Sequence, residues 1–199
     1  MTDLKNQTGS KSGFSRRDFF RGSGALAAAA ALQQTAEAVQ NDGAQVVKGK
    51  TSITLNVNGK DQTVEADATA TLLDVLRYEL DLTGAKPVSL DGSSGASTVF
   101  VDGKPMTAST ILALQARGKK IQTVESLADD EVPRAFVEHD AQQCGFCTPG
   151  FVMAVRALLN KKPNASEVEI REGLNGNICR CGTYDGIIDA ALSIAKGGN

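Results

Sequence analysis

The sequence has no tryptophan, few aromatic residues, no excess of basic charge and no long hydrophobic run. Aromatic residues make up 5% of the 199, and this length allows one ordinary domain or two small ones. Twenty-one basic against 23 acidic residues lack the basic excess of a nucleic-acid-binding protein. The apolar run at 22–32 is 11 residues long, short of the about 20 that a membrane-spanning helix needs. Four cysteines are too few for a disulfide-dense scaffold.

A pair of arginines marks the N-terminal segment. Arg16 and Arg17 precede two phenylalanines, the weakly apolar run at 22–32 follows, and a small-x-small cleavage signature ends at Ala38. The alternative interpretation is an alanine-rich amphipathic helix with an incidental arginine pair. The segment resembles a twin-arginine (Tat) export signal, an address read by a receptor. The resemblance implies that residues 1–38 are a signal peptide and that the chain reaches the periplasm already folded, often with its cofactor.

The spacing of apolar residues divides the remaining chain into a linker and two modules. With 41% hydrophobic and 22% charged residues, the composition is typical of a soluble globular protein. Residues 39–50 are polar and are interpreted as a linker. Strand-like patterns around one helix predict a small α+β module at 51–125, and helical spacing predicts a helical bundle at 126–199.

Local patterns predict the elements of each module. Ile53, Leu55 and Val57 alternate with polar residues before Asn58-Gly59, which predicts a β-hairpin whose turn has positive φ. The first module is further predicted to contain a helix at 72–80, a loop rich in glycine and serine to residue 97, and a strand at 98–101. The second module is predicted to contain helices at 132–140, 150–160, 166–173 and 184–196, the third capped by Ser166.

All four cysteines fall in the helical module, in two close pairs. Cys144 and Cys147 form a C-x-x-C pair, and Cys179 and Cys181 form a C-x-C pair. Each pair is expected in a loop just before a helix, where backbone N–H groups and the positive helix end stabilise thiolate charge. Thirty-one residues separate the pairs, enough for a helical hairpin that brings them to one metal centre.

Four chemistries compete for these thiols. Two disulfides would suit a periplasmic protein, although a C-x-C pair closes on itself only with strain. A thioredoxin-type pair would use Cys144 and Cys147, but no βαβ pattern surrounds them and the second pair would be idle. Structural zinc is chemically reasonable, although C-x-C is an uncommon half-site for it. A [2Fe–2S] cluster, whose usual donors are four cysteines, is favoured, and the others stay open on the residues alone.

The residues around both pairs resemble a known family. The run Gln-Cys-Gly-Phe-Cys-Thr-Pro-Gly at 143–150, together with Gly-Asn-Ile-Cys-Arg-Cys at 176–181, is similar to the iron–sulfur subunit of the molybdenum hydroxylases, the xanthine dehydrogenase and aldehyde oxidoreductase family. The Gly-Thr-Tyr ending at 182–184 resembles the exported bacterial aldehyde and isoquinoline oxidoreductase branch. The likeness covers essentially all of residues 51–196.

This resemblance implies a fold, a cofactor and partners. The implied fold is α+β: a β-grasp, ferredoxin-like domain followed by a four-helix domain with one [2Fe–2S] cluster on Cys144, Cys147, Cys179 and Cys181. The chain would transfer electrons from a large subunit that carries molybdopterin cytosine dinucleotide, with an FAD subunit or a cytochrome c as a further partner. Gln143 and Cys181 would face the pterin, and substrate would be oxidised in the large subunit. The opposing hypothesis is a structural or assembly subunit whose centre holds zinc or nothing.

The first module departs from the family where ferredoxin cysteines are expected. The plant-type spacing is C-x4-C-x2-C with a later fourth cysteine, and here Ser89, Ser94, Ser97 and Ser109 occupy those positions. The alternative is that serine and glycine simply fill a flexible loop. A serine hydroxyl has a far higher pKa than a thiol and is a harder donor. We therefore expect no stable cluster in this module, and expect the family's second electron relay to be missing.

Overall fold

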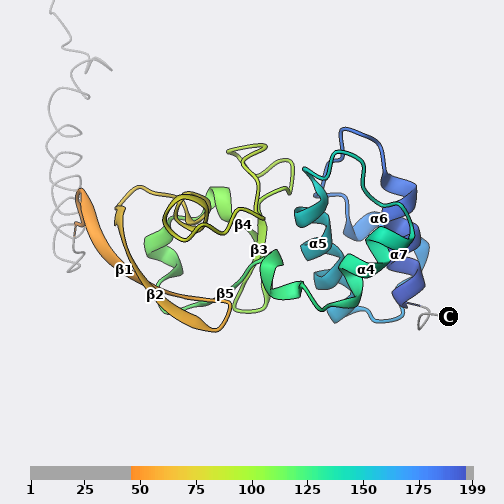
Figure 1. Cartoon of the computed structure of the whole chain (residues 1–199), viewed down its shortest axis with the longest axis horizontal. Coiled ribbons are helices and arrows are strands. Elements are labelled where there is room, and N and C mark those ends of the chain that lie inside the picture. The colour runs from red at the N-terminus through yellow and green to blue at the C-terminus, as the bar shows by residue number, and fades with distance from the viewer. Residues whose placement is uncertain (1–45, 196–199) are drawn as a thin grey trace, which may run out of the picture. The chain divides into compact units, whose positions relative to one another are not determined.

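A mixed sheet followed by four helices is the architecture of the chain (Figure 1). The computed structural model describes residues 46–195, so the predicted signal at 1–38 lies outside the described residues. Strands fill the first part of the described chain and helices the second. The predicted α+β class, with a helical domain after the sheet domain, is confirmed.

The first hairpin follows directly from its sequence pattern. Strands β1 (Lys50–Val57) and β2 (Lys60–Asp67) pair antiparallel over their full lengths. Asn58 and Gly59 form the turn with φ values of 52° and 79°, the left-handed backbone that asparagine and glycine adopt readily. The alternating side chains of β1 are fully buried on one face, so the predicted hairpin is confirmed.

A very short strand holds the sheet together at its centre. The order is β2-β1-β5-β3-β4, with β3 at Thr98–Val101, β4 at Lys104–Thr107 and β5 at Lys120–Gln122. Strand β5 runs parallel to β1 and antiparallel to β3. Short 3₁₀ turns at Ala108–Thr110, Ala113–Ala116 and Val124–Leu127 complete the connections.

The helix predicted at 72–80 is present but widens after its first turn. It begins as α3 (Leu72–Asp74), with Thr71 as its N-cap, and continues as a π-helical turn over Val75–Glu79. The Leu80 N–H donates to the Val75 carbonyl, five residues earlier, at 3.1 Å. The apolar stripe still faces the sheet core, since Leu72, Leu73, Val75 and Leu76 are buried and Leu80 is partly buried against them.

The helical domain contains the four predicted helices. They are α4 (Glu131–Glu138), α5 (Thr148–Lys161), α6 (Glu167–Gly173) and α7 (Tyr184–Ala195). Ser166 caps α6 as predicted, because its hydroxyl accepts from the Glu169 amide while the Glu169 carboxylate accepts from the Ser166 amide. Phe136, Phe151 and other apolar side chains of these helices form one buried core.

Helix α5 connects the two domains by packing against β3 and β4 (Figure 1). Strand β1 begins at Lys50, the last residue of the predicted linker, and the residue boundaries of linker and modules stay predictions. Within residues 46–195, the helices are all too short or too polar to cross a bilayer.

Candidate metal centre

The four cysteines lie in two loops, each directly before a helix, as predicted. Cys147 is the N-cap residue of α5, and Gly145 turns the loop before it with φ 77°. Cys179 and Cys181 precede α7, and Gly182 turns the chain into that helix with φ 79°. A side chain at either glycine would strain this left-handed backbone, so the glycines allow both loops to bend tightly toward one another.

The thiols meet as two pairs across the two loops. Cys144 interacts with Cys181, and Cys147 interacts with Cys179. All four are free cysteines. The Cys147–Cys179 pair is the inner one, since Cys179 is only 6% exposed, whereas Cys144 and Cys181 are both exposed.

The inner pair divides its protons unequally. Burial raises the pKa of Cys147 to about 12, with the neighbouring Cys179 as the next cause. Burial also acts to raise the pKa of Cys179, but the Thr183 hydroxyl and amide and the Cys147 thiol outweigh it and lower the value to about 7. The Thr183 hydroxyl lies 3.2 Å from the Cys179 sulfur. Without metal, Cys147 is therefore a protonated thiol at neutral pH, whereas Cys179 is divided between thiol and thiolate.

In the outer pair the two pKa values are likewise shifted in opposite directions. The Phe146 backbone amide, followed by the Cys181 thiol, lowers the pKa of Cys144. For Cys181, a backbone contact with Cys144 acts to lower the pKa, but the Cys144 side chain, burial and charge repulsion together raise it. Neighbouring thiolates repel one another, so ionisation of one thiol in a pair opposes ionisation of the other.

This donor set fits a [2Fe–2S] cluster. A cluster requires four thiolates, and bound iron would supply the positive charge that favours the thiolate form of all four cysteines. In the part of the chain that the structure describes, no three histidine, cysteine, aspartate or glutamate side chains are placed to hold a single ion. The four thiols are arranged as two neighbouring pairs, which would together hold the cluster.

Tyr184 and Thr183 support the inner pair, and sequence reasoning assigned them no such contact. The Tyr184 hydroxyl accepts the Cys179 backbone N–H at 2.8 Å. The Tyr184 ring packs edge-on against Phe151, with ring centroids 6.1 Å apart. A hydrogen bond to a backbone amide leaves no signature in residue spacing, so this contact of Tyr184 was not predictable from the sequence.

The four predicted serine positions are also brought together in pairs. The hydroxyls of Ser89 and Ser94 are 2.7 Å apart, and those of Ser97 and Ser109 are 3.0 Å apart. Ser94, Ser97 and Ser109 are buried. The arrangement pairs the first position with the second and the third with the fourth, in a loop of defined shape.

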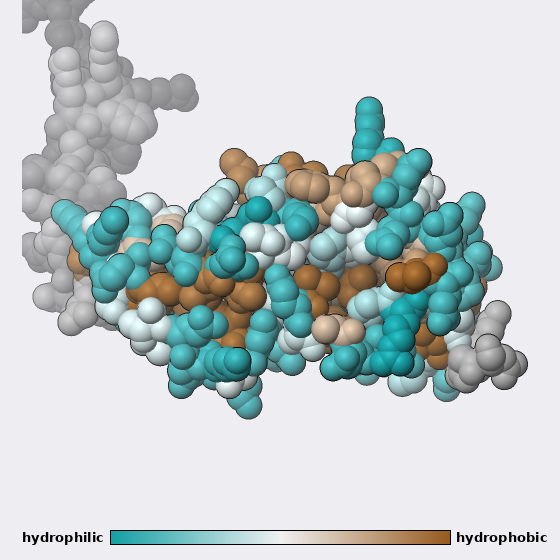
Figure 2. All heavy atoms as spheres, in the orientation of Figure 1, coloured by the Kyte–Doolittle hydropathy of each residue, from teal (hydrophilic) through white to brown (hydrophobic). Residues whose placement is uncertain are grey.

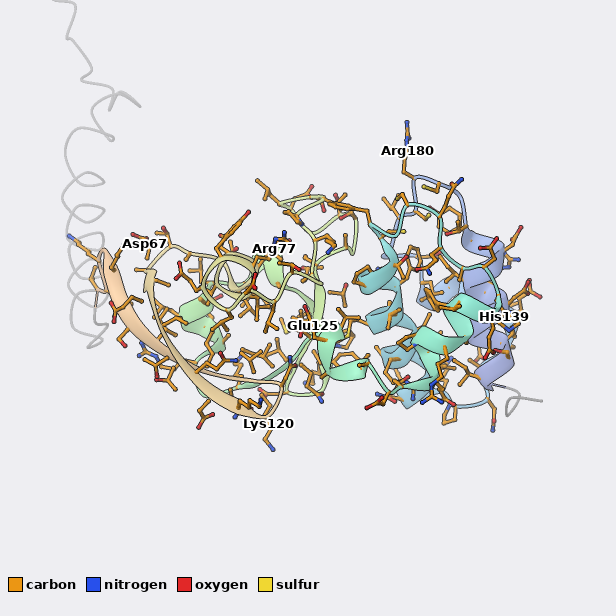
Figure 3. All side chains as sticks on the ribbon, viewed as in Figure 1. Asp67, Arg77, Lys120, Glu125, His139 and Arg180 are labelled. Atoms are coloured by element: carbon orange, nitrogen blue, oxygen red, sulfur yellow. The ribbon has the colours of Figure 1, made fainter. Side chains whose placement is uncertain are left out.

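Three polar residues of the helical domain lie in different surroundings. Gln143 is exposed beside Cys144 in the first cysteine loop. Arg180, between the two cysteines of the second pair, projects outward from its loop (Figure 3). His139 ends α4 as its C-cap residue (Figure 3).

Exposed apolar side chains surround the cysteine loops. Phe146 and Ile178, each next to a candidate ligand, are 49% and 54% exposed, and the Lys86 ammonium lies 6.0 Å from the Phe146 ring centroid. In Figure 2, apolar side chains gather along the upper edge of the face shown. Large apolar side chains exposed beside a polar centre are typical of a surface that another protein covers.

Comparison with known proteins identifies both ends of the chain. Residues 123–192 match the family model of the [2Fe-2S] binding domain. Residues 13–32 match the signal sequence of the twin-arginine translocation pathway, which agrees with the expected export signal.

Relatives match over most of their length. The nicotine 6-hydroxylase small subunit of Paenarthrobacter nicotinovorans is 42% identical over 146 residues, 72% of this chain and 88% of the relative. The aldehyde oxidoreductase iron-sulfur-binding subunit PaoA of Escherichia coli is 36% identical over 202 residues, 92% of this chain and 88% of the relative. Quinoline 2-oxidoreductase from Pseudomonas putida 86 is 37% identical, with a TM-score of 0.72 over 76% of this chain and 97% of that one.

The sheet domain and the [2Fe–2S]-binding helical domain define an iron–sulfur subunit of an oxidoreductase complex. The chain belongs to the small [2Fe–2S] subunits of the molybdenum hydroxylases, the family of xanthine dehydrogenase and aldehyde oxidoreductase. Members of this family transfer electrons in complexes with a large molybdopterin subunit. The Tat signal directs this member to export, into the periplasm.

Proposed function

We propose that this chain is the electron-transfer subunit of a periplasmic molybdenum-dependent hydroxylase of aldehydes or N-heterocycles. The observation that carries the proposal is that the two cysteines of one loop contact the two cysteines of the other. Relatives named as nicotine 6-hydroxylase and aldehyde oxidoreductase subunits support the substrate class. The Gly-Thr-Tyr ending at 182–184 supports the exported aldehyde and isoquinoline branch.

Each residue of the centre has a distinct part in this proposal. Cys147 and Cys179 would hold the cluster from its buried side, and Cys144 and Cys181 from its exposed side. The cluster supplies storage of a single electron. The Thr183 hydroxyl and the Tyr184 hydroxyl fix the Cys179 sulfur and backbone, so this ligand keeps one position when charge on the centre changes.

Two exposed residues, Gln143 and Cys181, mark the side of the centre on which electrons would enter. Gln143 and Cys181 are both exposed, as a face toward the molybdopterin cytosine dinucleotide of the large subunit requires. The Gln143 amide offers a donor and an acceptor to polar groups of such a cofactor. Electrons would enter on this side and leave on another.

The serine positions would end the usual relay. Hydroxyl groups that bond one another in the sheet domain are poor iron ligands, so we propose one cluster in this chain. The electron acceptor, an FAD subunit or a cytochrome c, would then have to approach the helical-domain centre itself.

Metal analysis tests the proposal against its alternative, a structural or assembly subunit with zinc or an empty centre. Protein purified from the periplasm with its partners should contain about two irons and two sulfides per chain, with the visible absorbance of a [2Fe–2S] cluster. Replacing Cys179 with alanine should abolish both, while Ser93→Ala should leave them unchanged. A colourless protein containing zinc would overturn the electron-transfer role.

A further inference from the structure

The loop at residues 89–97, here named the serine loop, is held in shape by its own hydroxyl groups. Ser89 and Ser94 hydroxyls bond at 2.7 Å, and the Ser94 backbone N–H donates to the Ser89 hydroxyl at 3.0 Å. The Ser97 hydroxyl bonds to that of Ser109 at 3.0 Å. Both members of this second pair are buried, at 2% and 6% exposure.

These pairs satisfy polar groups that would otherwise be buried alone. A buried hydroxyl without a partner costs free energy, whereas a donor and acceptor that meet do not pay this penalty. Alanine in place of Ser97 would leave the buried Ser109 hydroxyl without the bond it makes at 3.0 Å. The serine loop therefore keeps a defined shape with no metal ion in it.

The backbone of the serine loop binds the segment that leads into Cys179 and Cys181. The Ser94 carbonyl accepts the Ile178 N–H at 3.0 Å. The Gly95 carbonyl accepts the Asn177 side-chain amide at 3.1 Å. Ile178 directly precedes Cys179, so these two bonds fix the backbone immediately before an inner ligand.

The same loop touches α5, the helix that Cys147 caps at its N-terminus. Gly150 lies in α5, three residues after Cys147, and a Cβ atom there would collide with the Gly95 carbonyl. The Cα of Ala96 is also within 2.9 Å of that Cβ position. The close approach of α5 to the serine loop is possible because residue 150 is glycine.

We propose that the serine loop is a positioning element of the helical-domain centre: it holds the Cys147 helix and the Cys179 loop at a fixed separation. This inference rests on the proposed function in that these cysteines are taken to hold the cluster. The loop thereby has a use that needs no iron of its own. Its hydroxyl pairs replace the rigidity that a bound cluster would give to the same loop.

Amide hydrogen exchange on the complete purified protein tests the contact directly. Asn177→Ala removes the bond to Gly95, and Asn175→Ala is its control, since that side chain is exposed on the same segment. We expect the Ile178 amide to exchange about fivefold faster in Asn177→Ala, the effect of losing one hydrogen bond. Amides of the β1–β2 hairpin should not change, which separates positioning from general loss of stability.

The serine pairs are tested by iron release to a chelator, with the exchange of the Ile178 amide followed in parallel. Ser97→Ala leaves the Ser109 hydroxyl buried and unpaired, and should speed both processes about fivefold or more. The double change Ser97→Ala with Ser109→Ala removes both hydroxyls and should recover part of the effect. Ser93→Ala, whose hydroxyl bonds to Asp91 on the surface, is the control.

Two outcomes overturn the inference. Unchanged Ile178 exchange in both Asn177→Ala and Ser97→Ala would show that the serine loop does not position this segment. Iron release no faster than in the controls would show that its position does not matter to the centre. If the parent protein binds no iron, the electron-transfer role fails by itself, and the exchange experiment still decides whether the loop holds Ile178.

Discussion

The Cys179 backbone N–H donates to the Tyr184 hydroxyl at 2.8 Å, so a side chain in the first turn of α7 fixes an inner cysteine. The bond closes the loop around Cys181 on itself. Because the Tyr184 ring also packs on Phe151, the hydroxyl is held in place by the helical core.

Tyr184→Phe should weaken the centre without disturbing the packing of the ring. The change leaves the Cys179 amide without its acceptor, at a cost of about 1–3 kcal/mol for a buried group. We expect faster loss of iron to a chelator and a lower melting temperature. Tyr78→Phe is a matched control because Tyr78 is the other tyrosine of the chain and is 71% exposed; equal behaviour of the two variants would contradict the role of this bond.

Gln143→Ala should weaken cofactor retention by the large subunit or slow electron transfer from it, while the iron content of this chain stays the same. Loss of a paired hydrogen-bonding group costs about 1–3 kcal/mol, so molybdenum occupancy or the rate of cluster reduction by substrate should fall. The neighbouring Gln142 is also exposed, which makes Gln142→Ala the control. Cys181→Ala should lose iron as well as impair molybdenum occupancy or cluster reduction, since it also removes a cluster ligand. Unchanged occupancy and rate in Gln143→Ala would mean that the pterin faces another surface.

Replacing Ser89, Ser94, Ser97 and Ser109 together with cysteine should create a second cluster. The four side chains already meet as two pairs within 3.0 Å, and each replacement changes one atom. After reconstitution, iron should rise from about two to about four per chain. A single Ser93→Cys variant controls for adventitious binding by an extra thiol. Iron that stays at about two would show that the loop has lost more than its ligands.

Acid should destabilise the start of α6. The Lys162 side chain, followed by the Ser166 amide and hydroxyl, lowers the pKa of Glu169 to about 2 from an ordinary value of 4.5. A lowered pKa means that the stabilising contribution is complete above about pH 4.5 and is lost as the pH falls toward 2. Glu169→Gln should flatten this part of the dependence of thermal stability on pH. Glu138→Gln, at the end of α4, should follow the parent chain; the same curve for both variants would refute the assignment.

Local structure was predictable from the sequence where a short pattern determines it. The alternation at Ile53, Leu55 and Val57 with Asn58-Gly59 gave the hairpin, and the cap at Ser166 gave the start of α6. The family resemblance supplied the two-domain order. It also indicated that the two cysteine motifs form one centre. That this centre binds a cluster remains a prediction.

Long-range relationships were not predictable from local patterns. Strand β5 is three residues long, yet it lies between β1 and β3, and its place depends on partners far away in the sequence. The π-helical turn after α3 likewise has no signature in apolar spacing. The hydrogen bonds from Ile178 and Asn177 to the serine loop join segments more than 80 residues apart, and only folding reveals them.

Gly150 has a consequence for how such a protein can change over generations. The space that a side chain at residue 150 would need is filled by the backbone of the serine loop. Interiors packed this closely tolerate little change in volume. The atoms in the way belong to the backbone of residues 95–96, so a larger residue at 150 requires the serine loop itself to move, and no change of side chain at 95–96 makes room for it. A lineage that discards the loop as a relic must also rebuild the helix that carries Cys147.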